Sequence, residues 1–196
     1  MINNLKKQTR IFISYSRNDF EIANQLGQRL SSAGFEIFVD KESISAGEKW
    51  QERLLQLIKK CDRVLFLISP DSVASDVCDW EINQAETEGK SILPVVVRDT
   101  PIESVPGRLQ RIQFIEFSSL NADRDAQEIV NSLNKNIEWE RQKTEIHDWA
   151  TSWDDRGRRF WDLRLSRAAL SELEDWRDRQ PQRALPPTAL QLTYIT

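Results

Sequence analysis

Five short apolar runs recur along the first two thirds of the chain, separated by stretches with helical periodicity. The runs cover residues 11–14, 35–39, 64–68, 92–97 and 114–117. The third and fourth are apolar throughout rather than alternating, which is typical of strands covered on both faces. Strands and helices that alternate through short connections predict a parallel sheet with helices on both sides. The fold class is therefore α/β, and five strands favour a flavodoxin-like sheet with the order 2-1-3-4-5.

Between the runs, apolar residues return at the three- and four-residue spacings of an α-helix. They are Phe20, Ala23, Leu26 and Leu30 in the first stretch, Leu54, Leu55 and Ile58 in the second, and Ala126, Ile129, Val130 and Leu133 in a later one. Ser16, with Asp19 three residues on, is predicted to cap the first helix.

The character of the chain changes near residue 137. Five of the seven tryptophans follow that point, among many Arg, Asp and Glu residues. Leu165, Ser166 and Leu170 predict a hydrophobic staple and cap at the start of a helix. We therefore expect three parts: a main domain over 1–136, a small Trp-rich helical extension over 137–180, and an extended proline-bearing linker over 181–196. The tryptophans either pack the extension or couple the main domain to a further domain downstream.

Composition narrows the possible functions. The formal net charge of −4 argues against nucleic acid as the main partner, because phosphate binding requires clustered positive charge. No apolar stretch approaches the roughly 20 residues of a membrane span, and the polar start does not resemble a signal peptide. Two cysteines, Cys61 and Cys78, favour a reducing, cytoplasmic location. With His147 as the lone histidine, neither a His-based triad nor a His/Cys metal site is expected.

The predicted topology also indicates where a site belongs. Open α/β sheets bind ligands beyond the carboxyl ends of their strands, at the switch point that here lies between strands 1 and 3. The loops at that point are 14–19 and 69–75, and the second leads into a helix that we expect to begin near Ser75. In that helix Cys78, Ile82 and Ala85 form an inward stripe, and Glu81 lies on or beside it. A carboxylate there needs a structural partner or a functional role; the plainer alternative is a carboxylate at the edge of the stripe with its head in water.

Four blocks of sequence together resemble a Toll/interleukin-1 receptor (TIR) domain over residues 10–136. In order they are RIFISYSRND, GFEIFVDKESISAGEKW, VLFLISPDSVASDVCDWE and ILPVVV. The third block carries a Cys-x-x-Glu signature as Cys78 and Glu81. The tail is similar to a Trp- and Arg-rich segment that follows TIR domains in some bacterial multidomain proteins.

The resemblance implies one of two functional classes. Many plant, bacterial and axon-degeneration TIR domains cleave NAD+ between nicotinamide and ribose, whereas animal receptor and adaptor members serve as assembly surfaces. By its position, Glu81 takes the catalytic role of the first class. A single carboxylate suits this reaction, because nicotinamide departs as a neutral molecule without the protonating acid that ordinary glycosidases need. NAD+ is then a substrate, and no cofactor or metal is implied.

Supporting residues follow from the same resemblance. Those expected to bind substrate are Tyr15, Ser16, Arg17, Asp40, Ser69, Ser75, Val77 and Cys78. Arg17 is the expected pyrophosphate partner, while Ser75 serves equally well as a plain helix cap. Residues 40–49 resemble the loop that gates the pocket and mediates TIR–TIR contacts, with Gly47 supplying its turn and Trp50 anchoring the next helix.

Two positions depart from the enzymatic pattern. Val77 stands where relatives often carry tryptophan, and Trp80 lies next to Glu81 instead. Ala46 stands where proline often precedes the glycine of the gating loop. These changes leave Glu81 in place but bear on how well the isolated domain binds nicotinamide.

Three hypotheses result. The first is a bacterial immune or signalling effector that cleaves NAD+ to nicotinamide and either ADP-ribose or a cyclic form, activated by self-association under a downstream sensor domain. The second is a non-catalytic assembly module in which Glu81 only caps or pairs. The third is another flavodoxin-like N-glycosyl enzyme, related to the nucleoside deoxyribosyltransferases.

Overall fold

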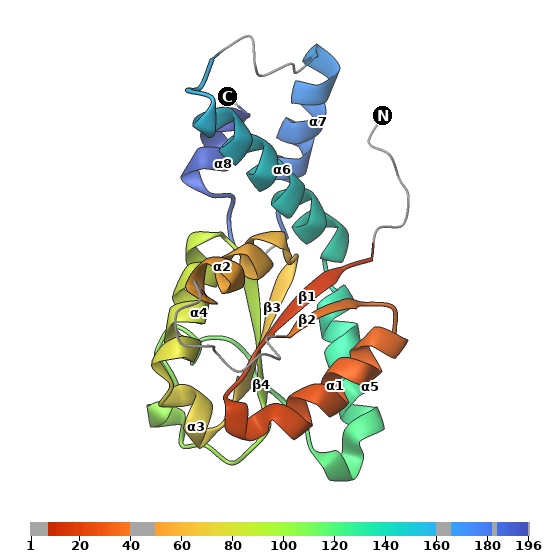
Figure 1. The fold of residues 1–196 in the computed structure, drawn as a ribbon. Coiled ribbons are helices and arrows are strands. Elements are labelled where there is room, and N and C mark those ends of the chain that lie inside the picture. The colour runs from red at the N-terminus through yellow and green to blue at the C-terminus, as the bar shows by residue number, and fades with distance from the viewer. Residues whose placement is uncertain (1–7, 40–49, 160–165, 182–183, 196) are drawn as a thin grey trace. The chain divides into compact units, whose positions relative to one another are not determined.

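A computed structural model describes residues 8–39, 50–159, 166–181 and 184–195 (Figure 1). Asp40, Ala46 and Gly47, with the rest of the predicted gating loop, lie outside the described residues, as does Leu165 of the predicted staple. The described residues belong to two compact units, Met1–Lys135 and Asn136–Thr196.

The first unit is built on a five-stranded sheet in the order β2-β1-β3-β4-β5, and every adjacent pair is parallel. The strands are β1 (Arg10–Ser14), β2 (Glu36–Val39), β3 (Arg63–Ile68), β4 (Ser91–Val96) and β5 (Ile115–Glu116). The predicted fold class and strand order are confirmed. The strand order reverses between β1 and β3, which is the switch point where the sequence predicted a ligand-binding site.

Helices cover both faces of this sheet (Figure 1). They are α1 (Phe20–Ser32), α2 (Trp50–Lys60), α3 (Pro70–Val73), α4 (Asp76–Thr87) and α5 (Ala122–Asn134), with short 3-10 turns η1 (Arg17–Asp19), η2 (Ile102–Ser104) and η3 (Ser119–Asn121). Alternate residues of each strand point to opposite faces. Ile11 and Ile13 therefore pack with α1 and α5, while Phe12 packs with α2.

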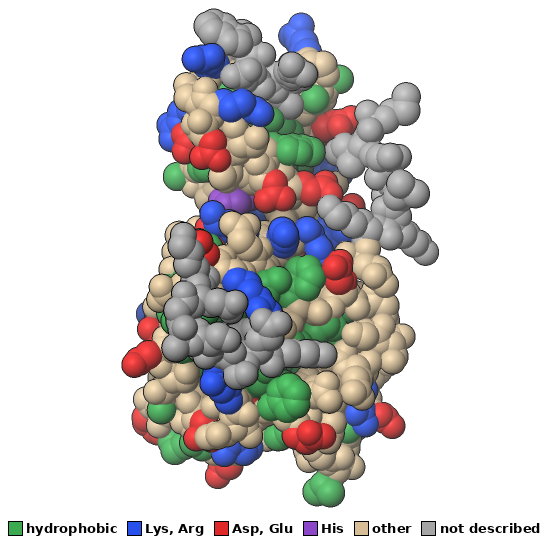
Figure 2. All heavy atoms as spheres, in the orientation of Figure 1, with side chains coloured by type: hydrophobic (Ala, Val, Ile, Leu, Met, Phe, Trp, Pro, Cys, Tyr) green, Lys and Arg blue, Asp and Glu red, His purple; other side chains and the backbone are tan. Residues whose placement is uncertain are grey.

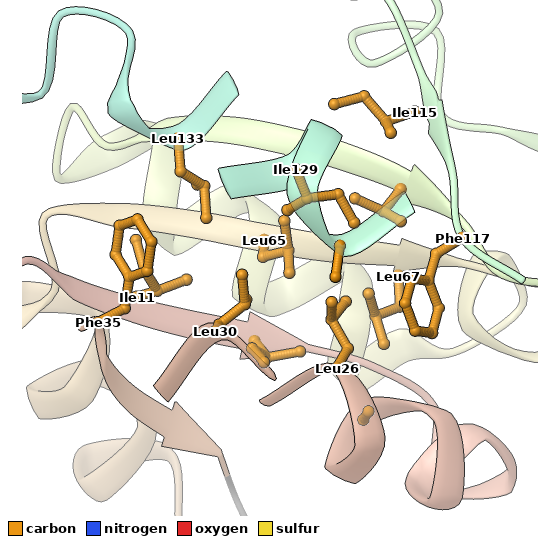
Figure 3. Packing of buried hydrophobic residues seen from close by; sticks show 14 of the residues in the cluster. Ile11, Leu26, Leu30, Phe35, Leu65, Leu67, Ile115, Phe117, Ile129 and Leu133 are labelled. Atoms are coloured by element: carbon orange, nitrogen blue, oxygen red, sulfur yellow. The ribbon is translucent and has the colours of Figure 1, made fainter. Parts of the chain in front are cut away.

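The core on the α1/α5 face joins residues that are far apart in sequence. Figure 3 shows Leu26 and Leu30 of α1 meeting Leu65 and Leu67 of β3, with Ile129 of α5 beside them. All five side chains are fully buried. Burial of such side chains contributes about 1.5–3 kcal/mol each, so both helices are firmly attached and the carboxyl edge of the sheet has a rigid base.

The start of α1 differs from the sequence prediction. Ser16 precedes the 3-10 turn η1, and its side chain makes no capping hydrogen bond, so its predicted role as the cap of the first helix is wrong. The helix instead begins at Phe20, with Asp19 at the N-cap position, and the Asp19 side chain does not cap either. The Asp19 carboxylate is used elsewhere, in the site described below.

The second unit contains α6 (Ile137–Asp155), α7 (Arg167–Asp178) and α8 (Ala189–Tyr194). Asn136, which separates α5 from α6, adopts a left-handed backbone with φ of 58°, a conformation that asparagine tolerates better than most residues. The predicted cap of α7 is confirmed, because Ser166 Oγ accepts a hydrogen bond from the Ala169 amide.

A paired set of tryptophans forms the core of this unit. The rings of Trp139 and Trp176 stack with centroids 5.0 Å apart. Each indole N–H donates to the other residue's carbonyl, at 3.0 and 3.2 Å. Trp153 packs edge-on against Tyr194. Trp149, one turn before Trp153, is 40% exposed, so the tryptophans of α6 do not all serve the core.

The prediction of an extended linker over residues 181–196 is wrong for the second half of that range. Residues 189–194 form α8, which begins with a reciprocal capping box between Thr188 and Gln191. Gln191 is fully buried, and its side-chain amide donates to the carbonyl of Lys143 in α6 at 2.6 Å. The segment is therefore part of the second unit.

Candidate active site

Polar side chains gather at the carboxyl ends of three adjacent strands of the first unit. Ser14 ends β1, Ser69 follows β3, and Arg98 follows β4. Because the strands are parallel, their ends meet at one edge of the sheet. Glu81 reaches the same edge from α4.

Glu81 is buried and hydrogen-bonded. Only 5% of the residue is exposed, and its Oε2 accepts a hydrogen bond from Ser14 Oγ at 2.5 Å. A hydroxyl bound to a carboxylate at this distance is a charge-assisted hydrogen bond. The inward position predicted for Glu81 is confirmed, and the alternative of a carboxylate in open water is wrong.

The placement of Glu81 follows from how α4 is fixed. Ser75 caps the helix, as predicted, by accepting a hydrogen bond from the Cys78 amide at 3.3 Å. Ile82 and Ala85 are fully buried beneath the helix. The cap sets where the helix starts and the apolar pair sets its rotation, so together they direct Glu81 toward Ser14.

Cys78 lies one turn before Glu81 and is itself buried. Burial raises the pKa of its thiol from 9.0 to about 11. Within that net rise, the negative charges of Glu81 and Asp19 also act to raise the pKa, whereas hydrogen bonds with Ser75 and Ser14 act to lower it. Cys78 is therefore a protonated thiol at neutral pH and packs beside the carboxylate rather than acting as a nucleophile.

Both cysteine thiols are expected to be inert in the folded protein. Burial also raises the pKa of Cys61 to about 12. Near neutral pH, a thiol-reactive chromogen should label neither cysteine until denaturant is added, whereupon both should react. Rapid labelling of either thiol in the native protein would contradict this expectation.

The raised pKa values of the two thiols also determine how the free energy of unfolding changes at alkaline pH. The unfolded chain loses these protons near pH 9, while the folded protein keeps them. Stability should therefore be unaffected below that pH and should fall above it, by at most about 1.4 kcal/mol per pH unit for each thiol.

A second buried carboxylate, Asp19, lies at this edge and is 2% exposed. It accepts hydrogen bonds from Ser69 Oγ at 2.5 Å and from Arg98 Nε at 2.7 Å. Arg98 also pairs with Asp71, which accepts a further hydrogen bond from the Asn18 side chain at 2.9 Å. The hydrogen bond from Arg98, followed by that from Asn18, holds the pKa of Asp71 below its usual range.

Three predicted substrate-binding residues lie on the loop after β1. Tyr15 is half-buried, with its ring 6.4 Å from that of Phe20. Ser16 is half-buried, and Arg17 is exposed. Their roles toward a substrate stay predictions.

The other predicted binding residues have structural partners in this conformation. The Ser69 hydroxyl accepts a hydrogen bond from the Ser72 amide at 3.0 Å and donates to Asp19. Val77 packs on the face of the sheet that α2 covers. Trp80 packs edge-on against Trp50, with centroids 5.8 Å apart, so Trp50 anchors α2 as predicted and the Trp80 ring is engaged with it.

Sequence reasoning missed three members of the site. In the sequence, Ser14 and Asp19 stand out only as the ends of the loop 14–19, with Asp19 also three residues after the predicted cap Ser16, and Arg98 is not among the predicted site residues. A usable signal existed, because each is a polar residue within a few positions of the carboxyl end of a predicted strand. Their contacts span 50 to 79 positions along the chain, so only the fold brings them together.

Residues 11–133 match the family model of the TIR domain. The chain belongs to the TIR family. The matched part lies within the first unit and takes in α4 and all five strands except Arg10, the first residue of β1.

Known proteins similar to this TIR domain differ in what their names say of them. It is 25% identical to human Toll-like receptor 1 over 55% of this chain and 14% of the receptor. It is 28% identical to the Drosophila melanogaster NAD(+) hydrolase sarm1 over 64% of this chain and 10% of that protein. The chain thus spans only a small part of these relatives.

A solved structure with the same fold is the TIR domain of the Toll-related receptor TRR-2 from Hydra magnipapillata. The TM-score is 0.52 at 23% identity, over 65% of this chain and 97% of the Hydra domain. At that identity the likeness shows the fold.

The described ranges contain neither a candidate membrane span nor a candidate metal site. None of the described helices is long and apolar enough to cross a membrane. Within the same ranges, no group of three or more His, Cys, Asp or Glu side chains could hold a metal ion. On the face shown in Figure 2, Lys and Arg side chains lie among Asp and Glu side chains rather than in one basic patch.

Proposed function

We propose that this TIR domain cleaves NAD+ at the bond between nicotinamide and ribose, with Glu81 as the catalytic residue. The observation that carries the proposal is a buried carboxylate at the ligand-binding edge of the sheet, held by Ser14 at 2.5 Å. Burying a carboxylate costs free energy even when it is hydrogen-bonded, so a buried carboxylate at this edge is a candidate functional residue.

The chemistry requires one negative group in a defined position. As the glycosidic bond breaks, its electron pair leaves with nicotinamide, which becomes neutral, and positive charge develops on the ribose. Glu81 would lie against the ribose hydroxyls and stabilise that charge. A carboxylate has about four acceptor positions, so the hydrogen bond from Ser14 orients Glu81 and leaves acceptor capacity for the sugar.

The second half of the reaction fixes the product. Water that adds to the ribosyl cation and loses a proton gives ADP-ribose, whereas attack by a nucleophilic atom of the same molecule gives a cyclic product. Both stay within the proposal.

The relatives support the class of reaction but do not determine the compartment, the mode of activation or the biological role. The Drosophila relative is named as an NAD(+) hydrolase and matches 64% of this chain. We further propose that the domain acts in the cytoplasm, that self-association activates it, and that it serves as an immune or signalling effector under a downstream sensor domain.

A second candidate function is a non-catalytic assembly module. The observation that favours it is the similarity to human Toll-like receptor 1, a protein named as a receptor. In that case the hydrogen bond between Ser14 and Glu81 would be purely structural.

One experiment separates these functions. The protein is concentrated or crowded until it clusters, supplied with NAD+, and assayed for free nicotinamide alongside Glu81→Ala. We expect release by the native chain and none by the variant. Turnover that survives in the variant removes Glu81 from catalysis, and no turnover in any clustered state supports the assembly module. A deoxynucleoside supplied with a free base should show no exchange, which separates the deoxyribosyltransferase alternative.

A further inference from the structure

We propose that Asp19 is a positioning residue for Glu81. This inference rests on the proposed function for its kinetic consequence, but its structural basis is independent of that function. Asp19 holds Ser69 by a hydrogen bond. It acts through Ser69 and the short segment that joins β3 to α4.

Hydrogen bonds link Ser69 to Cys78 in steps of three residues. The Ser72 amide donates to Ser69 Oγ at 3.0 Å, and the Ser72 hydroxyl donates to the Ser69 carbonyl at 3.1 Å. The Ser75 amide donates to the Ser72 carbonyl at 3.2 Å. The Cys78 amide then donates to Ser75 Oγ at 3.3 Å, and Glu81 lies one turn further along α4. The position of Ser69 therefore sets where α4 begins.

Asp19 holds the first member of this series. Its hydrogen bond from Ser69 Oγ is 2.5 Å long, and both residues are buried. Since the Ser69 hydroxyl also accepts from Ser72, its donor and acceptor functions are both in use. β1 and the loop after it are thus attached to residues 69–81 at three points: Ser14 to Glu81, Asn18 to Asp71 and Asp19 to Ser69.

Arg98 offsets the free-energy cost of burying the Asp19 carboxylate. An unpaired carboxylate at 2% exposure would be strongly unfavourable, and Arg98 compensates it through a 2.7 Å hydrogen bond from Nε. Arg98 itself comes from the loop after β4 and is 39% exposed. The carboxyl ends of β1, β3 and β4 are thereby tied together around Asp19.

Asp71 offers a matched comparison. It binds the same arginine, but from the outer, partly exposed side, and it makes no contact with Ser69 among the hydrogen bonds of the described residues. An exposed ion pair of this kind contributes little to stability. Loss of Asp71 should leave the series from Ser69 to Glu81 intact.

Removing the Asp19 carboxylate is expected to slow the catalytic step rather than weaken substrate binding. A small displacement of a catalytic group costs up to about 100-fold in rate. Asp19→Asn should therefore lower kcat by about 10- to 100-fold with KM changed by less than about threefold, whereas Asp71→Asn should stay within about twofold of the native rate. Ser69→Ala should reproduce the loss, and the double variant should be no worse than either single one, because both changes break the same link.

A second readout does not depend on any activity. Amide hydrogen exchange at Ser72 and Cys78 should accelerate by about tenfold or more in Asp19→Asn but not in Asp71→Asn, under conditions where all variants are folded. If Asp19→Asn does not fold, Ser69→Ala carries the same test.

The outcomes separate the two proposals. A native chain without turnover, combined with faster exchange in Asp19→Asn, overturns the proposed function and keeps the positional role of Asp19. Equal exchange in the Asp19→Asn and Asp71→Asn variants overturns that role. Where the native chain is active, additive rate losses for Asp19→Asn and Ser69→Ala also overturn that role.

Discussion

Glu81→Gln is expected to leave the domain folded and to lower the rate of NAD+ cleavage by about 10²- to 10³-fold, the usual effect of removing one electrostatic group from a transition state. Glutamine has the same shape, and its amide oxygen can still accept the hydrogen bond from Ser14 Oγ that Glu81 accepts at 2.5 Å. Only the negative charge is lost. Because ribose carries the developing positive charge, the loss should appear in kcat rather than in KM.

The measurement is nicotinamide release by the clustered protein, with thermal unfolding as the check on folding. Glu86→Gln is the matched control, since Glu86 is exposed on the same helix and pairs with Arg108 at 3.6 Å. The control should keep native activity. A Glu81→Gln variant with native kcat would show that the carboxylate has no part in the chemistry, and the structural interpretation of its contact with Ser14 would then stand alone.

Trp176→Ala is expected to destabilise the second unit by about 3–5 kcal/mol, the usual cost of deleting a buried aromatic side chain. The ring stacks on Trp139 at 5.0 Å. Its removal leaves a cavity and also leaves the Trp139 carbonyl without the 3.2 Å hydrogen bond that the Trp176 indole donates. With only 61 residues in that unit, counted from Asn136 to Thr196, such a loss is a large share of its stability.

Denaturant unfolding followed by hydrogen exchange measures this effect separately in each unit. Exchange in residues 136–195 should rise in the variant, while the strands of the first unit keep their protection. Trp149→Ala is the matched control, because Trp149 is 40% exposed and should cost well under about 1 kcal/mol. Equal destabilisation by the two variants would contradict the assignment of the paired tryptophans to the core.

The fold could be predicted because its signals are local and repeated. Apolar runs of strand length mark all five strands, and right-handed crossovers leave few possible orders. The inward position of Glu81 also follows from local periodicity, since Cys78, Ile82 and Ala85 fix the buried side of α4.

The rest of the site could not be predicted for the opposite reason. From its local sequence, Asp19 is expected in the first helical turn, three residues after the predicted cap Ser16, yet its carboxylate accepts hydrogen bonds from Ser69 and Arg98, which lie 50 and 79 positions away. The choice between local capping and a distant ion pair is made by tertiary packing alone. The incorrect prediction of an extended linker at α8 has a different cause. Thr188 and Gln191 have the spacing of a capping box, which favours a helix, but the two prolines directly before them favour an extended chain.

The three-residue steps from Ser69 to Glu81 also restrict how this segment can change in length. Each residue of an α-helix turns by about 100°, so one residue inserted between Ser75 and Glu81 would swing the carboxylate away from Ser14 and bring an apolar neighbour toward the polar edge. A three-residue insertion would keep the direction approximately but would move the carboxylate about 4.5 Å along the helix axis. The number of residues in this segment is therefore as much a condition of the site as the identity of Glu81.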